Sequence, residues 1–136
     1  MAYKTAIEVP RSDNAWIDGL TDGYRWGTTA TDPAVGYTFI SPTFDRPGGT
    51  FGGYPSWGWS DQERRLLEGA MEEISAVCSL QFDDRGDDND DGVEIWYYNL
   101  GKRQSEGSYG FAYTPGSDSD EGLVAINWST YQNADG

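Results

Sequence analysis

The sequence predicts an α/β fold in which a twisted, mostly parallel sheet of about five strands packs against one main amphipathic helix. Three observations predict it. One segment, 61–77, repeats its apolar residues with a helical period. Several short segments rich in β-branched and aromatic residues lie before and after it. The 136 residues also include 18 Gly, 6 Trp, 9 Tyr and 5 Phe, which suit a turn-rich domain with an aromatic core.

The helix is predicted from its cap and its period. Ser60 and Glu63 form the pattern of a capping box at its start. The apolar stripe predicts one face buried on a sheet, with Cys78 as a buried, inert thiol. This stripe consists of Leu66, Leu67, Ala70, Met71, Ile74, Val77 and Cys78. The opposite face, predicted to meet solvent, carries Arg64, Arg65, Glu68, Glu72 and Glu73.

The predicted strands share β-branched and aromatic residues bounded by Gly, Pro or acidic turns. They cover 35–40, 80–82, 93–97, 110–114 and 123–128. One strand before the helix and four after it give an α/β domain. The polar residues 1–15 are predicted to form a flexible N-terminal segment, and 16–136 a single domain.

The charge of the chain excludes several partners. The formal net charge is −14, from 23 acidic and 9 basic residues. Such a surface repels nucleic acid and anionic membranes, and it attracts cations such as calcium. No apolar stretch is long enough to span a membrane, and 1–12 lacks the apolar region of a secretory signal. We therefore expect a chain that is cytoplasmic, or exported without a cleaved N-terminal signal.

One acidic loop predicts a possible calcium site. Asp87, Asn89, Asp91 and Gly92 match the first half of a D-x-[DN]-x-[DN]-G loop. Tyr98 stands where a bidentate Glu would complete that loop. The alternative, a solvated acidic turn between two strands, is favoured.

Two other clusters are weaker candidates, one for glycoside hydrolysis and one for sugar binding. Carboxylates crowd a second loop, but an exposed loop gives no reason for a raised pKa and therefore disfavours glycosidase chemistry. These are Asp118, Asp120 and Glu121. A run of aromatic side chains could stack on a sugar, although packing into the core is favoured. It consists of Phe51, Tyr54, Trp57 and Trp59.

An ordered series of segments carries a family likeness over about residues 20–132. They are Gly23-Tyr24-Arg25-Trp26, the strand at 35–39, the segment 59–82, Gly92-Val93-Glu94-Ile95-Trp96, 109–116 and 122–127. Together they resemble the N-terminal half of the catalytic domain in serralysin-type metzincin zinc peptidases. The resemblance implies that a zinc helix with a His-Glu-x-x-His-x-x-Gly-x-x-His pattern follows next.

The sequence contains no histidine, so the resemblance implies an N-terminal subdomain that is inactive alone and holds no catalytic residue. Zinc is implied for the full-length family only, and a missing C-terminal half is an implied partner. The family also implies an extracellular location. The alternative is a non-catalytic acidic module that binds a peptide, a sugar or calcium.

The resemblance assigns one further role. In metzincins the strand matched by 110–114 forms the upper rim of the cleft and pairs with an extended peptide or protein substrate. Its residues here are Gly110, Phe111, Ala112, Tyr113 and Thr114. Pro115 and Gly116 follow and end the strand. The alternative is an ordinary edge strand.

Overall fold

A five-stranded sheet with one helix against it forms the body of the computed structural model, which describes residues 4–15, 24–29, 31–44, 56–101, 110–116 and 121–126. The strands are β3 (Ala34–Phe39), β4 (Gln81–Asp84), β5 (Ile95–Asn99), β6 (Gly110–Ala112) and β7 (Leu123–Ile126). Their order is β4-β3-β5-β7-β6, and β6 alone pairs antiparallel. The predicted α/β fold with a mostly parallel sheet is therefore confirmed.

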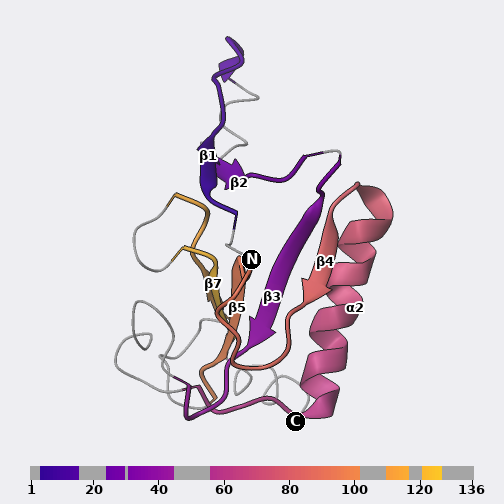
Figure 1. Ribbon diagram of the computed structural model, residues 1–136, viewed down its shortest axis with the longest axis vertical. Helices are drawn as coiled ribbons and strands as arrows, with labels where there is room; N and C mark the ends of the chain where they lie inside the picture. The colour runs from indigo at the N-terminus through magenta and orange to yellow at the C-terminus, as the bar shows by residue number, and fades with distance from the viewer. Residues whose placement is uncertain are drawn as a thin grey trace.

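Helix α2 (Asp61–Val77) runs alongside β3 and β4 (Figure 1). Its predicted bounds and its capping box are confirmed. The Ser60 hydroxyl accepts a hydrogen bond from the Glu63 amide at 3.3 Å, and the Glu63 carboxylate accepts one from the Ser60 amide at 2.8 Å. These two bonds satisfy N–H groups that the first helical turn leaves without a partner.

The prediction of which face of α2 is buried is wrong, because the face toward the sheet is rotated relative to the apolar stripe. Met71 is buried and Leu67 partly so, but Leu66 is 56% exposed and Val77 87% exposed. Cys78 is also exposed, which overturns the buried thiol; its Sγ lies 3.2 Å from the Ile74 carbonyl oxygen. Positions 64, 67, 71 and 75 form the narrow line of α2 that faces the sheet, so five of the seven residues of the apolar stripe are exposed.

The core has two parts, one on each face of the sheet. On the face that α2 covers, the buried residues are Tyr37, Phe39, Met71 and Tyr97, with Trp59, Leu67, Phe82, Ile95 and Val124 packed on them. On the other face they are Ile40, Val93, Trp96, Tyr98, Leu100, Leu123 and Ala125, with Phe44 beside them. Trp59 therefore packs into the core, as favoured from the sequence, whereas Trp57 is 50% exposed and Phe51 and Tyr54 lie outside the described residues.

A small antiparallel pair joins the N-terminal segment to the rest. β1 (Ala6–Glu8) pairs with β2 (Tyr24–Trp26), although the sequence predicts no strand within 1–15. Lys4 holds this segment to the main sheet, because its ammonium group donates to the Ala34 carbonyl oxygen at 2.7 Å. Its backbone amide donates to Glu94, a carboxylate only 3% exposed that also accepts from the Gly36 amide. Among the described residues no helix is long and apolar enough to cross a membrane.

The buried tyrosines predict an alkaline limit of stability. Burial raises the pKa of Tyr97 from 10.0 to about 12, and burial followed by the charge of Asp84 raises that of Tyr37 to about 12. The folded state therefore keeps both protons where the unfolded chain loses them. The resulting stability is complete below pH 10 and is lost as the pH rises toward 12.

We expect the free energy of unfolding to fall by roughly 1 kcal/mol per pH unit for each tyrosine above pH 10. Urea denaturation at pH 9, 10 and 11 measures this slope. Tyr97→Phe should make the slope shallower. An equal slope in the doubly substituted chain, Tyr37→Phe with Tyr97→Phe, would contradict the assignment.

Candidate functional site

The predicted edge strand lies at the edge of the sheet. β6 pairs with β7 through the partners Gly110–Ile126, Phe111–Ala125 and Ala112–Val124. Within the described part of the chain, no strand pairs with its other side. Regular strand geometry ends at Ala112, two residues before the predicted end, but the ladder continues: the Tyr113 amide donates to the Leu123 carbonyl oxygen at 2.9 Å.

The hydrogen bond between the Tyr113 amide and the Leu123 carbonyl oxygen shows which way the peptide groups point along β6. Tyr113 also accepts a hydrogen bond from the Gly122 amide at 3.0 Å, so both its peptide groups point toward β7. Adjacent residues in a strand direct their peptide groups to opposite edges. The N–H and C=O of Ala112 therefore point to the outer edge, where a further strand could pair.

The side chains near β6 are partly exposed. Phe111 is 38% exposed and Tyr113 is 36% exposed. After Thr114 and Pro115 the chain turns, and the Glu121 carboxylate accepts a hydrogen bond from the Gly116 amide at 2.9 Å. Glu121 thus closes the turn that ends the edge strand, while Asp118 and Asp120 lie outside the described residues.

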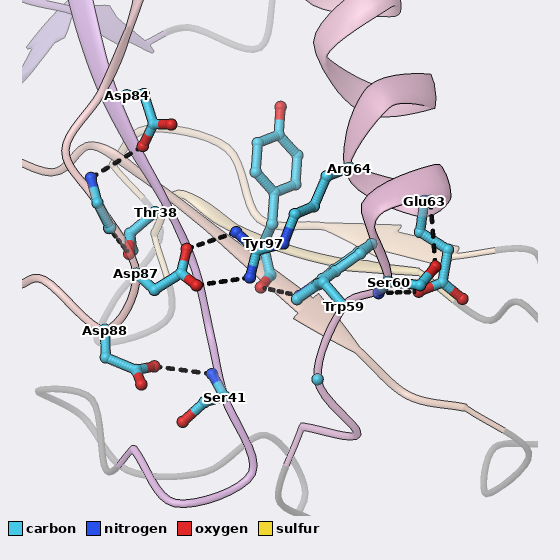
Figure 2. A network of polar contacts seen from close by, with 12 residues as sticks. Thr38, Ser41, Trp59, Ser60, Glu63, Arg64, Asp84, Asp87, Asp88 and Tyr97 are labelled. Carbon is cyan, nitrogen blue, oxygen red and sulfur yellow. Dashed lines mark hydrogen bonds and ion pairs between the residues drawn. The ribbon is translucent and has the colours of Figure 1, made fainter.

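The acidic loop of the calcium prediction is braced by its own contacts. Asp87 accepts two hydrogen bonds from Arg64, at 2.6 and 2.5 Å, in a bidentate ion pair (Figure 2). The Asn89 side chain donates to the Arg85 carbonyl oxygen at 2.6 Å and accepts from the Asp91 amide at 2.9 Å. The Asp87 carboxylate and the Asn89 side chain, both predicted calcium ligands, are therefore already engaged with protein groups.

Neighbouring contacts fix the loop to β3 and to the segment after it. Asp88 accepts a hydrogen bond from the Ser41 amide at 2.7 Å, and Asp84 accepts one from the Gly86 amide at 2.8 Å. The Thr38 hydroxyl donates to the Gly86 carbonyl oxygen at 2.7 Å. Among the residues that the structure describes, no group of three or more His, Cys, Asp or Glu side chains is arranged to hold a metal ion.

The predicted position of Arg64 on the solvent face of the helix is wrong. The period assigned it to the solvent face, yet its guanidinium lies 4.8 Å from the centre of the Phe39 ring. The hydrogen bond to Asp87 raises the pKa of Arg64 above its usual range, against the opposing effect of burial. Arg64 thereby joins the first turn of α2 to the loop after β4 and to the core.

A double-mutant cycle tests this link. We expect a coupling free energy of about 0.5–1 kcal/mol between Arg64→Ala and Asp87→Ala, because the pair is bidentate but partly exposed to solvent. Chemical denaturation of the four variants measures it, and the coupling should decrease in 1 M salt. Arg65→Ala, which removes an exposed neighbour on α2, should cost less than about 0.5 kcal/mol. Zero coupling at low salt would contradict the prediction.

The zinc that the resemblance implies does not fit this chain. Zinc sites in peptidases use nitrogen-rich ligands that leave one position open, and the sequence supplies no histidine. No step of peptide hydrolysis can therefore be assigned to residues described above.

Comparison with known proteins adds no relative. The chain gave no significant match to protein-family models, to curated proteins or to solved structures.

Proposed function

We propose that this chain is the N-terminal subdomain of a serralysin-like, secreted zinc endopeptidase, and that it holds an extended peptide substrate along β6. One observation carries the proposal: β6 is antiparallel and lies at the edge of an otherwise parallel sheet, with the peptide groups of Ala112 directed outward. An extended peptide can pair with such an edge through main-chain hydrogen bonds.

Because β6 is short, it would contribute more to the orientation of a bound peptide than to its affinity. β6 covers three residues, and Ala112 offers one outward N–H and one outward C=O. Each main-chain hydrogen bond adds about 1 kcal/mol, so this edge alone gives weak binding. The exposed Phe111 and Tyr113 rings lie on the face opposite α2, since Phe111 pairs with Ala125. They could contact alternate side chains of a paired peptide.

Hydrolysis is not part of what this chain contributes. The catalytic ligands and the general base of the resembling family belong to a helix whose histidines this sequence lacks. We therefore expect no casein hydrolysis by the chain, with or without added zinc.

Proline substitution tests the peptide-binding edge. The probe is acetyl-Thr-Val-Thr-Val-Thr-amide, titrated into isotopically labelled protein and followed by two-dimensional NMR. Ala112→Pro removes the outward N–H but leaves the bonds between Tyr113 and β7 intact, so it should weaken binding about tenfold while the rest of the spectrum is retained. Ala112→Val keeps that N–H and is the matched control. Equal binding by Ala112→Pro and the unsubstituted chain would show that β6 is not the site.

A second candidate is a non-catalytic acidic binding module, favoured by the absence of histidine. The coding sequence that follows or adjoins this one separates the two. A His-Glu-x-x-His segment there supports the peptidase. One stoichiometric zinc retained by the purified chain would instead contradict our statement that its residues do not fit zinc.

A further inference from the structure

A pocket of about 290 Å³ lies between α2 and the β3–β4 side of the sheet. This is the sheet edge opposite β6. Six residues line the pocket, three of them with aromatic or thioether groups and three with polar side chains. They are Tyr37, Glu68, Met71, Glu72, Ser75 and Phe82.

The inner part of the pocket is apolar. Tyr37 and Met71 are each 5% exposed, and Phe82 is partly buried beside them. Aromatic rings and a thioether make favourable contacts with a short alkyl chain. The rings also present negatively polarised faces, which attract a cation that comes close to them.

The outer part carries negative charge. Glu68 and Glu72 stand four residues apart on α2, and neither makes an ion pair within the described part of the chain. Like charges at this spacing repel each other on a helix surface. Asp84 adds a further negative charge, since it and Glu68 both act with burial to raise the pKa of Tyr37 to about 12. The backbone amide of Arg85 donates to the Tyr37 carbonyl oxygen, and the Arg85 side chain pairs with Asp83 at 3.6 Å.

The Tyr37 hydroxyl is the polar group on the apolar side of the pocket. Tyr37 as a whole is 5% exposed, and its hydroxyl makes no hydrogen bond with another described residue. The hydroxyl oxygen still reaches solvent, because among the described residues Arg85 Nε is the enclosed side-chain polar atom without a partner. It can therefore meet a ligand that enters the pocket. A cation in the pocket would donate a hydrogen bond to it, because the hydroxyl oxygen can accept one.

We propose that this pocket binds an alkylammonium cation, such as a lysine side chain of a partner. The alkyl part would pack on Met71 and Phe82, and the ammonium would lie between the two glutamates and the Tyr37 hydroxyl. A metal ion fits less well, because no three acidic side chains in the described residues form a group that could hold one. The net charge of −14 favours the approach of any cation.

Titration with n-pentylammonium chloride, followed by two-dimensional NMR, tests the site in the full chain. We expect saturable shifts at the amides of Ser75 and Phe82. Replacing both glutamates, Glu68→Gln with Glu72→Gln, should weaken binding about tenfold or more, and Tyr37→Phe several-fold. Glu73→Gln is the matched control, since Glu73 lies on the same helix, is exposed and does not line the pocket. It should leave binding unchanged.

Four results would overturn the proposal. They are the absence of saturable shifts, equal binding by the double glutamine variant, equal binding of neutral 1-pentanol, and tighter binding of CaCl₂ at the same amides. The third would identify a merely apolar pocket, and the fourth a divalent-cation site. Because glutamine has the shape of glutamate, the variant's unperturbed spectrum elsewhere shows that its fold is retained.

Discussion

Phe39→Ala is expected to destabilise the chain by about 3–5 kcal/mol, which is most of the stability of an ordinary small domain. Phe39 is 1% exposed and lies at the centre of the core under α2. Its ring stacks on Tyr97 at 5.4 Å between ring centres and meets Trp59 edge-on at 5.2 Å. Deleting the ring leaves a cavity between strand and helix that rigid neighbours cannot fill.

The same substitution also removes the surface on which Arg64 lies. The loss therefore includes the cation–ring contact and loosens the ion pair with Asp87. Urea denaturation followed by tryptophan fluorescence measures the effect. Phe39→Leu should cost much less, about 1–1.5 kcal/mol, because most of the volume stays.

Phe111→Ala is the control of matched residue type for Phe39→Ala. Phe111 is 38% exposed in β6, so its loss should cost less than about 1 kcal/mol. A similar cost at both positions would show that the sheet face under α2 is not the main core. That result would also undermine the assignment of α2 to this face.

The elements of this fold could be predicted because their signals are local. Ser60 and Glu63 mark the start of α2 within one turn, and the strand at 34–39 is recognisable from its own composition. Each of these two statements needs only a short stretch of chain. The edge position of β6 was expected from the resemblance over about residues 20–132, and its antiparallel direction was not predicted.

The facing direction of α2 could not be predicted, because it depends on distant partners. Periodicity defines an apolar stripe, but it does not say which neighbours the stripe meets. Here Arg64 finds a ring in β3 and a carboxylate 23 residues further along the chain, and Glu68 borders a pocket beneath the helix. These pairings turn polar positions toward the sheet and leave Val77 outside.

The calcium motif illustrates the same limit. Asp87 and Asn89 have the spacing of a metal loop. Spacing does not reveal that the Asp87 carboxylate binds Arg64 and that the Asn89 side chain donates to the Arg85 carbonyl oxygen. The β1–β2 pair was also not predicted from the sequence. Each strand has only three residues, and such short strands are stable only when they pair with each other.

Gly122→Ala is expected to destabilise the chain by roughly 3–5 kcal/mol and to weaken peptide binding at β6 as well. Gly122 has φ +76°, which costs a residue with a Cβ about 1–2 kcal/mol. An added Cβ would also lie 1.9 Å from the Glu94 carbonyl oxygen and 3.1 Å from the Trp26 ring. Backbone atoms must move to relieve the first of these contacts.

That movement would disturb the strands on both sides. The Gly122 carbonyl oxygen accepts from the Trp96 amide at 3.0 Å, and its amide donates to the Tyr113 carbonyl oxygen at 3.0 Å. One residue thus aligns β5 with β7 and fixes the end of the edge strand. A displaced Gly122 would turn Tyr113, and with it the outward peptide groups of Ala112, away from the geometry that a paired peptide requires.

Gly86→Ala separates conformational strain from steric overlap. Gly86 has φ +81°, close to that of Gly122, but an added Cβ there meets nothing within 4 Å. It should therefore cost only the conformational term of about 1–2 kcal/mol and leave the peptide titration unchanged. Equal destabilisation by the two alanines would mean that the contact with Glu94 is relieved without cost. In that case β5, β7 and the edge strand are not coupled through Gly122, and their alignment must come from the apolar contacts of Leu123 and Ala125 instead.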